Sequence, residues 1–393
     1  AERIWSAAFT DLGKLDQREN GMNIILFSNH WYPSPRRAGF HHLADAWHSQ
    51  GHTITFVTTG FSYISWIRRD FRTRFVGIRQ ACNTWQHLQE RFDSYVFFTA
   101  VHPHTTLIPA IDRLLNPLMT CYGRLLPSTL QARITAADII VYESCAALYL
   151  VNQCRQLAPQ AQHIYRVSDD IRTMRSTPAG MVLLEQNLAH FFSCISVPCR
   201  ALLQKFSGLP QANFQPHGLK KDLFDRCITN PYAPGSRNAI FCGLGFYDAN
   251  TIHTMARSHT DVQFHIIGID APQKDIPDNV RYYGELPFTE TIPYIKFADI
   301  GLYTLQNSHS RPMQAYTDSL KIIQYRYCGL PIVSPDFLDL HREGVFYYHP
   351  GDPASCAAAM EHALQYGRHS EYADEVHSWD EVARNILESS SHH

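Results

Sequence analysis

Short apolar runs, each followed by a segment of helical length, recur along almost the whole chain of 393 residues. In the first half these runs are residues 23–28, 53–59, 95–100, 138–144, 163–168 and 194–197. They are rich in Ile, Val, Tyr and Phe and are nearly continuous, which is typical of strands buried on both faces of a parallel sheet. The pattern therefore predicts alternating strands and helices, with helices at 38–50 and 145–157.

A stretch rich in Pro and Gly, residues 213–237, interrupts this pattern and predicts a linker between domains. Beyond it the alternation starts again, and it predicts strands at 238–242, 262–268, 280–284, 300–305, 330–334 and 345–349. Helices are expected at 289–297, 318–328 and 353–366. Two successive βα-repeating halves imply an α/β protein with two Rossmann-like domains and a cleft between them. We expect an N-terminal domain at 21–213, a C-terminal domain at 236–366, and a segment at 367–390 that crosses back to the first domain.

Composition and charge narrow the class of protein. The formal net charge of -2, from 34 basic and 36 acidic residues, argues against bulk nucleic-acid binding. No apolar run reaches the length of a spanning helix, because Glu143, Arg155 and Glu185 interrupt the best candidates. The first 20 residues lack the apolar core of a signal peptide. We therefore expect a cytoplasmic protein.

The cysteines and histidines favour neither a disulfide framework nor a metal centre. The 10 cysteines fall singly inside apolar stretches, without a CxxC pair, as expected of reduced buried thiols. The 22 histidines form no HExxH or similar spacing, and the chain contains no DxD pair of carboxylates. The sequence therefore predicts no metal and no cofactor.

Ligands of open α/β sheets bind beyond the carboxyl ends of the strands, and Asp169 and Asp170 follow a predicted strand there. A partly desolvated carboxylate at that position is suited to removing a proton from a substrate hydroxyl. Asp also caps helices well, so either residue can instead be the N-cap of the next helix. The residues alone leave both interpretations open.

In the second half, residues 318–321 (DSLK) open a predicted helix, and Asp318 or Ser319 is its expected N-cap. Free N–H groups at a helix start attract phosphate, and Lys321 and Gln324 lie on one helix face, from which both can reach one ligand. A solvated Lys on a surface helix is the alternative. Gly243 follows a strand, which predicts a tight turn close to a nucleotide's phosphates, although the GLG run lacks the full dinucleotide fingerprint.

One further candidate lies in this half. Glu285 follows a predicted strand and offers a carboxylate for a base or ribose edge, or it merely begins the following helix. The charge of a leaving pyrophosphate is expected to be met by Lys321, an arginine and helix N-termini.

Membrane contact is indicated by residues 61–75, where aromatic residues alternate with arginines, among them Trp66, Arg68 and Arg69. Aromatic and basic residues together fit the headgroup region of an anionic membrane surface. The same composition also fits an ordinary packed helix or base stacking. Arg36 and Arg37, after the first strand, are candidates for a lipid diphosphate or the membrane surface, or are ordinary solvated arginines.

Several motifs, in order along the chain, resemble those of the GumK-type glucuronosyltransferases of glycosyltransferase family 70. They are DIIVYES at 138–144, YRVSD at 165–169, HG at 217–218, GE at 284–285 and DSLKIIQY at 318–325, with PRRA at 35–38 and VHP at 101–103. The resemblance covers residues 23–379. Three positions depart from the family pattern: Lys220 stands where an Asp is usual, Leu305 stands at the position of a tyrosine near the uracil, with Tyr303 close by, and the Gly243 turn reads GLG.

The resemblance implies a GT-B fold and an inverting, metal-independent transfer of glucuronate from UDP-glucuronate. The implied acceptor is the mannose of a polyprenyl-diphosphate-linked oligosaccharide in bacterial exopolysaccharide synthesis, and the implied location is the cytoplasmic face of the inner membrane, by peripheral attachment. It also implies that Asp169 is the general base. The donor site then contains Glu285, Leu320, Lys321 and Gln324, together with Gly243 and Tyr303. Other functions stay open: the same fold with another nucleotide-sugar donor, a sugar-nucleotide epimerase, or a lectin-like scaffold.

Overall fold

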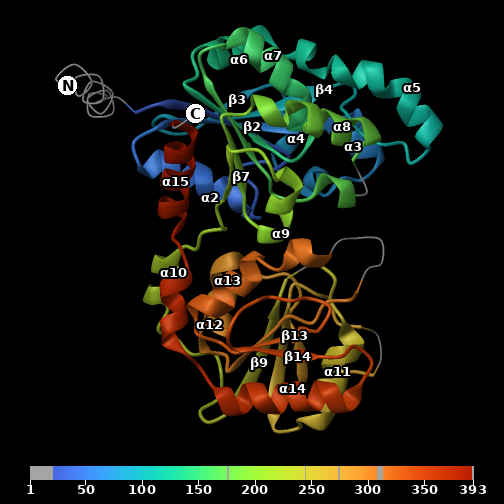
Figure 1. Ribbon diagram of the computed structural model, residues 1–393, viewed down its shortest axis with the longest axis vertical. Helices are drawn as coiled ribbons and strands as arrows, with labels where there is room; N and C mark the ends of the chain where they lie inside the picture. Colours follow the sequence, from blue (N-terminus) through green and yellow to red (C-terminus); the bar gives the residue numbers. More distant parts are fainter. Residues whose placement is uncertain (1–20, 175–176, 244, 273–274, 308–312, 392–393) are drawn as a thin grey trace, which may run out of the picture. The chain divides into compact units, whose positions relative to one another are not determined.

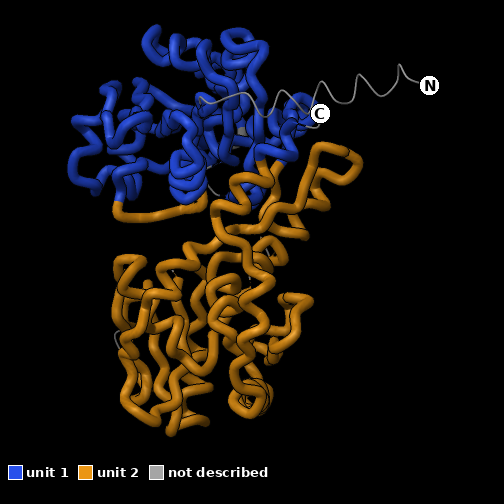
Figure 2. Tube along the Cα trace, turned by 90° about the vertical axis from the view of Figure 1, so that its left-hand side faces the viewer, with its two compact units in different colours: residues 1–34, 40–195, 387–393 blue, residues 35–39, 196–386 orange. Residues whose placement is uncertain are grey.

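The computed structural model describes residues 21–174, 177–243, 245–272, 275–307 and 313–391. Its chain forms two compact units, which Figure 2 distinguishes by colour. Unit 1 comprises residues 1–34, 40–195 and 387–393, and unit 2 comprises residues 35–39 and 196–386. The chain has two sheets: most strands of the first lie in unit 1, and all strands of the second lie in unit 2.

The first sheet has eight strands in the order β3-β4-β2-β1-β5-β6-β7-β8. The central strands β4, β2, β1, β5 and β6 run parallel, whereas β3 joins the edge in antiparallel orientation. Leu26 of β1 lies opposite Phe56 and Val141 of its two neighbours, and all three side chains are fully buried. The strands are β1 (Asn23–Ser28), β2 (Thr53–Ser62), β3 (Trp85–Gln89), β4 (Phe92–Thr99), β5 (Ile139–Glu143), β6 (Gln162–Arg166), β7 (Cys194–Val197) and β8 (Ala212–Phe214).

Helices connect these strands in sequence. They are α2 (Gly39–Ser49), α3 (Tyr63–Ile67), α4 (Ile78–Ala81), α5 (Pro109–Thr120), α6 (Ser128–Thr135), α7 (Val151–Leu157), α8 (Ala179–Leu188) and α9 (Arg200–Leu203). Short 3-10 turns lie among them, and two of them bear on the site: η1 (Phe71–Arg74) and η4 (Ile171–Thr173).

The second sheet has six parallel strands in the order β11-β10-β9-β12-β13-β14. They are β9 (Arg237–Cys242), β10 (Val262–Ile267), β11 (Val280–Tyr282), β12 (Ile300–Leu302), β13 (Ile332–Pro335) and β14 (Val345–Tyr348). The helices of this half are α10 (Lys221–Arg226), α11 (Ala249–Ser258), α12 (Phe288–Phe297), α13 (Leu320–Tyr327), α14 (Pro353–Tyr366) and α15 (Trp379–Ser391). Helix α14 packs against β14 and against α11 (Figure 1).

The order of the strands in each sheet indicates where a ligand site is expected. In each sheet the chain order reverses between two neighbouring strands, β1 and β5 in the first and β9 and β12 in the second. Ligands of open α/β sheets bind at the carboxyl ends of the strands beside such a switch point. The residues that directly follow these strands are therefore the first candidates for chemistry.

Every strand predicted from the sequence is present, and the α/β prediction is confirmed. The sequence missed β3 and β8, because β3 is a largely polar edge strand and β8 is only three residues long. The predicted linker contains β8 and α10. Helix α15 belongs to unit 2 up to Ile386 and to unit 1 from Leu387 onwards.

Candidate active site

Glu143, the last residue of β5, joins the carboxyl ends of three neighbouring strands in unit 1. Its Oε2 accepts hydrogen bonds from Ser28 Oγ at 2.6 Å and from the Asn29 backbone N–H at 3.0 Å. Its Oε1 accepts one from Ser168 Oγ at 3.0 Å and lies 3.7 Å from His30 Nε2. The carboxylate is only 5% exposed, so it is a buried acid held by donors that follow β1 and β6.

Asp169 directly follows this cluster, and its backbone N–H donates to Ser144 Oγ at 3.0 Å. Asp170 is the N-cap of the 3-10 turn η4, because its carboxylate accepts from the Arg172 backbone N–H and pairs with the Arg172 guanidinium at 2.6 Å. The capping interpretation therefore holds for Asp170 and not for Asp169. Asp169 keeps solvent-accessible surface although protein atoms surround it closely, while Asp170 is buried.

The environment of Asp169 makes its carboxylate a better proton acceptor. Desolvation by the surrounding protein, followed by repulsion from the Glu143 carboxylate, raises the pKa of Asp169 above its ordinary value. Asp170 adds a smaller repulsion, and His30 opposes the shift. A raised pKa is a property of carboxylates that act as general bases.

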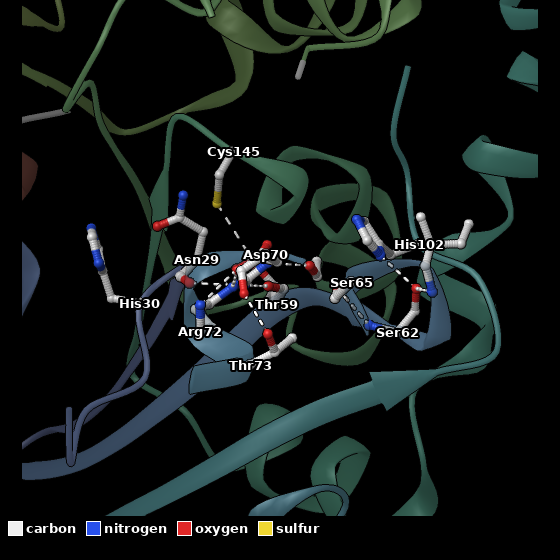
Figure 3. A network of polar contacts seen from close by, with 12 residues as sticks. Asn29, His30, Thr59, Ser62, Ser65, Asp70, Arg72, Thr73, His102 and Cys145 are labelled. Carbon is white, nitrogen blue, oxygen red and sulfur yellow. Dashed lines mark hydrogen bonds and ion pairs between the residues drawn. The ribbon is translucent and has the colours of Figure 1, made fainter. Parts of the chain in front are cut away.

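A buried arginine fixes the loops beside this cluster (Figure 3). Arg72, in η1, is 5% exposed and donates to the backbone carbonyls of Asn29, Thr59 and Gly60 at 2.7–2.9 Å. Asp70 balances its charge through contacts at 2.8 and 3.0 Å. Asn29 also donates its backbone N–H to Glu143. Arg72 and Glu143 therefore hold the same residue after β1, one through its carbonyl and the other through its N–H.

In unit 2, Lys321 lies beside the turn that follows β9. Its Nζ is 3.6 Å from the centre of the Phe241 ring and 5.3 Å from that of Tyr303. Burial lowers the pKa of Lys321 to about 7. Gly243 has φ +155°, and a Cβ there would lie 2.9 Å from the Lys321 Nζ. A residue with a Cβ at position 243 would collide with the Lys321 side chain, and glycine avoids this collision.

Of the two N-cap candidates at the start of α13, Ser319 is the N-cap residue, and within the described part of the chain its side chain makes no capping hydrogen bond. Asp318 is 6% exposed, forms an ion pair with Arg342 and accepts from the Arg200 backbone N–H at 3.1 Å. Asp318 is therefore not the cap, because its carboxylate is engaged by these two groups.

Glu285 precedes α12, whose N-cap is Pro287, so it does not begin that helix. It forms a bidentate ion pair with Arg36, with distances of 3.0 Å from Nε to Oε1 and 3.1 Å from Nη2 to Oε2. Both side chains are substantially exposed, at 40% for Arg36 and 52% for Glu285. Arg37 next to it is partly buried.

The other predicted donor residues lie at or near α13. Leu320 and Gln324 are partly exposed in the helix, as Lys321 is. Tyr303 is 2% exposed, and its hydroxyl donates to the Tyr316 carbonyl at 2.5 Å. It therefore lies behind Lys321 as part of the aromatic surface that the ammonium group contacts.

A cavity of about 750 Å³ lies on the other side of α13 in unit 2. It is lined by Ile322, Ile323 and Arg326 of the helix and by the Asp318–Arg342 pair. Neither Lys321 nor the other predicted donor residues line it.

The predicted membrane segment divides into buried and exposed side chains. Phe61 and Arg72 are buried, and Trp66 packs on Phe61 at 4.8 Å between ring centres. Arg68 and Arg69 are exposed. The sequence missed a second exposed surface on α5 and the residues before it, where large apolar side chains recur every three or four positions: Leu107 (72%), Ile111 (42%), Leu114 (77%) and Leu118 (70%).

Glu143 and His30 are the site residues that sequence reasoning did not single out. The available signal was their position, since each follows or ends a predicted strand next to the switch point. Among the described residues no group of three or more His, Cys, Asp or Glu side chains is arranged to hold a metal ion. In that same part of the chain, no helix combines the length and the apolar character needed to cross a bilayer.

Comparison with known proteins finds similar sequences. Residues 26–198 match the family described as glucuronosyltransferase GumK, N-terminal domain. The chain is also 27% identical over 346 residues to the UDP-glucuronate:glycolipid 2-beta-glucuronosyltransferase of Xanthomonas campestris pv. campestris, which covers 88% of this chain and 84% of the relative. The chain is a glycosyltransferase similar to the GumK-type glucuronosyltransferases. The resemblance seen in the sequence motifs is confirmed.

Solved structures show the fold of this chain. A glycosyltransferase from Rickettsia africae superposes with a TM-score of 0.61 at 9% identity, covering 95% of this chain and 98% of that chain. Anabaena HepE, solved with UDP and glucose, gives a TM-score of 0.60 at 12% identity, covering 94% of this chain and 99% of that chain. Both are glycosyltransferases of the GT-B fold, and the predicted fold class is confirmed.

Proposed function

We propose that the protein is an inverting, metal-independent glucuronosyltransferase that moves glucuronate from UDP-glucuronate to the mannose of a polyprenyl-diphosphate-linked oligosaccharide in exopolysaccharide synthesis. The observation that carries the proposal is the match to the Xanthomonas enzyme, which extends over most of both chains. The position of Asp169 and Lys321 at the carboxyl ends of two parallel sheets supports it.

The reaction begins with an acceptor hydroxyl whose proton passes to Asp169. The oxygen then attacks the anomeric carbon of the donor, and the bond from that carbon to the UDP oxygen breaks. One displacement inverts the configuration, so a second carboxylate acting as nucleophile is not required. The raised pKa of Asp169 supports its role as the base, because a general base works best when its pKa lies closer to the operating pH.

The departing UDP carries negative charge, and Lys321 is the group assigned to meet it. The ammonium lies beside Gly243, where the backbone comes close without a side chain. The backbone N–H groups at the start of α13 add a positive dipole end. These groups supply the electrostatic stabilisation for which other transferases use a divalent ion, and this is the basis for proposing a metal-independent reaction.

The remaining donor contacts are assigned to Glu285, Leu320 and Gln324, with Tyr303 supporting Lys321 from behind. Glu285 is paired with Arg36, so a ribose or sugar group that hydrogen-bonds to this carboxylate competes with the arginine. Arg36 and Arg37 are proposed to face the donor or the acceptor's diphosphate.

We also propose that unit 1 attaches to an anionic membrane surface on the cytoplasmic side. The exposed leucine and isoleucine stripe of α5 provides apolar area, and Arg68 and Arg69 provide positive charge. Arg68 is within electrostatic range of His102, in the loop that leads to α5, so the two surfaces are connected through this loop. Apolar and basic side chains together are what an interfacial segment requires.

A donor screen tests the proposed reaction. Purified protein is incubated with extracted lipid-linked saccharides and radiolabelled UDP-glucuronate, UDP-glucose or a GDP-sugar, with and without EDTA. We expect label to enter the lipid fraction from UDP-glucuronate alone, at the same rate in EDTA. Transfer from another donor would assign a different substrate, and UDP-sugar conversion without acceptor would identify an epimerase.

Flotation with vesicles of anionic phospholipid tests the membrane surface. The double variant L114S/L118S is expected to lose most of its vesicle association. The variant I228S is the matched control, because Ile228 is 87% exposed but lies in unit 2. Equal flotation of L114S/L118S and wild type would reject α5 as the docking element.

A further inference from the structure

The buried carboxylate of Glu143 has no role in the reaction as described so far, yet it occupies the centre of the strand ends that lead to Asp169. It accepts hydrogen bonds from groups beyond β1 and β6, and its own strand, β5, lies between them. A buried charge of this kind is costly unless its environment holds it, and here three donors do so.

Two hydrogen bonds connect the segment of Glu143, at the end of β5, to the segment of Asp169, which follows the neighbouring strand β6. Ser168, the residue before Asp169, donates its hydroxyl to Glu143 Oε1. Ser144, the residue after Glu143, accepts the Asp169 backbone N–H at 3.0 Å. Two adjacent residues of one segment are thus bound to two adjacent residues of the other, which fixes both the position and the direction of the Asp169 backbone.

Charge is the second link. The charged and titratable groups that face Asp169 are Glu143 at the end of β5, His30 beyond β1 and Asp170 next in the chain. Glu143 repels the ionised form of Asp169, and His30, when protonated, attracts it. His30 Nε2 lies 3.7 Å from Glu143 Oε1, so the imidazole also offsets part of the Glu143 charge.

We propose that Glu143 is a positioning residue for the general base: it fixes the backbone that carries Asp169 and, by its negative charge, makes Asp169 a stronger proton acceptor. This inference rests on the proposed function, in which Asp169 takes the proton of the acceptor hydroxyl. His30 acts on the same group in the opposite direction. Arg72 supports the arrangement from behind, because it holds the carbonyl of Asn29 while the N–H of that residue donates to Glu143.

The variant E143Q separates charge from shape. The amide oxygen can occupy the position of Oε2 and accept from Ser28 and Asn29, and the amide nitrogen can donate to the Ser168 hydroxyl, which then acts as acceptor. The hydrogen-bonding pattern is kept and the negative charge is lost.

The experiment is the pH profile of kcat/KM for sugar transfer by full-length wild type, E143Q and H30A. Because a general base must be deprotonated, activity rises with pH through the pKa of Asp169. We expect E143Q to move this acidic limb to lower pH by about 0.5 unit or more and to lower the plateau a few-fold, and H30A to move the limb to higher pH. E185Q, which neutralises another buried glutamate of unit 1, is the matched control and leaves the limb in place.

Titration of 13C-labelled aspartate by NMR measures the same property without any turnover, with the Asp169 signal identified by its loss in D169N. A lower pKa of Asp169 in E143Q supports the proposal. An unchanged pKa, or an equal change in E185Q, overturns it. If E143Q does not fold, the upward shift expected in H30A carries the test. Full transfer activity in D169N would instead reject Asp169 as the base, so failure of the proposed function is distinguishable from failure of this inference.

Discussion

The carboxyl ends of the two sheets hold charged groups that are perturbed in opposite directions. In unit 1, Asp169 faces the buried acid Glu143, and its pKa is raised. In unit 2, Lys321 lies against aromatic rings, and burial lowers its pKa to about 7. Among the described residues, no carboxylate forms an ion pair with Lys321. Both environments disfavour the charged form of the group that they hold.

The difference indicates two distinct chemical tasks. A carboxylate whose charged form is disfavoured takes up a proton readily, as a base must. An ammonium group whose charge is not satisfied by the protein gains most from an anionic ligand, such as a diphosphate. In the proposed reaction, the same principle, desolvation beside a switch point, prepares one sheet for the proton and the other for the leaving group.

The largest expected effect comes from removing the base of unit 1. D169N is expected to lower kcat about 10²- to 10⁴-fold, the usual contribution of a positioned general base. UDP affinity, measured by calorimetry, stays within about twofold of wild type, because the variant does not alter unit 2. Normal turnover in D169N, or a parallel loss of UDP affinity, would contradict the division of tasks.

Removing the cation of unit 2 is expected to have the next largest effect. K321M should lower kcat/KM for the donor about 10²- to 10³-fold, in line with loss of one stabilising group at a developing charge. It should also weaken UDP binding, which D169N does not. K205M, a change at another lysine of unit 2, serves as the control, and an equal loss there would show that the effect is not specific.

The pH dependence of UDP affinity sharpens the assignment of Lys321. Because its pKa in the free protein is about 7, wild type must take up a proton on binding UDP at higher pH. The Kd is expected to rise with pH between 7 and 9, by up to about tenfold per unit, where the terminal phosphate of UDP is already ionised. K321M should give a flat profile, and a flat profile in wild type would exclude the lysine as the titrating group.

The same lysine affects the stability of the free protein. Its pKa is about 7 when folded, against 10.5 for the ordinary side chain, so the unfolded chain binds more protons between these values. The free energy of unfolding of wild type, relative to K321M, is therefore expected to rise as the pH increases from 7 to 10. Chemical denaturation at several pH values measures this difference, and a decrease would contradict the burial of the lysine.

The smallest effect is expected from the exposed pair beside the donor residues. E285Q should raise the KM for UDP-glucuronate several-fold while changing the free energy of unfolding by less than about 1 kcal/mol, since exposed ion pairs contribute little. D261N is the matched control, because Asp261 forms an exposed pair with Arg237 at 3.0 Å in the same unit. An unchanged KM in E285Q would remove Glu285 from the donor site.

The sequence predicted the strands well because buried parallel strands are nearly continuous apolar runs, as in β1 and β5. It failed for β3, where polar residues at a sheet edge give no such signal. Lys321 and Asp169 were identified through the carboxyl-end rule and the family motifs.

Glu143 was not identified as a site residue, because it ends a strand like any polar residue and its meaning depends on Ser28, Asn29 and Ser168, which are distant in sequence. The sequence left Asp318 and Ser319 as alternative N-caps for a related reason. The position of Asp318 favours an N-cap, but the partner that engages it, Arg342, lies 24 residues further on. Long-range polar partners are set by the fold, and local sequence patterns do not report them.

The configuration of the product tests most directly whether one base in unit 1 and one leaving-group site in unit 2 are sufficient. The new glycosidic bond formed by wild type from UDP-glucuronate, whose sugar is α-linked, is examined by NMR. A single displacement predicts a β-linked product from wild type, and the same product from D169N at a rate about 10²- to 10⁴-fold lower. An α-linked product would require a second displacement on the protein and would contradict the account.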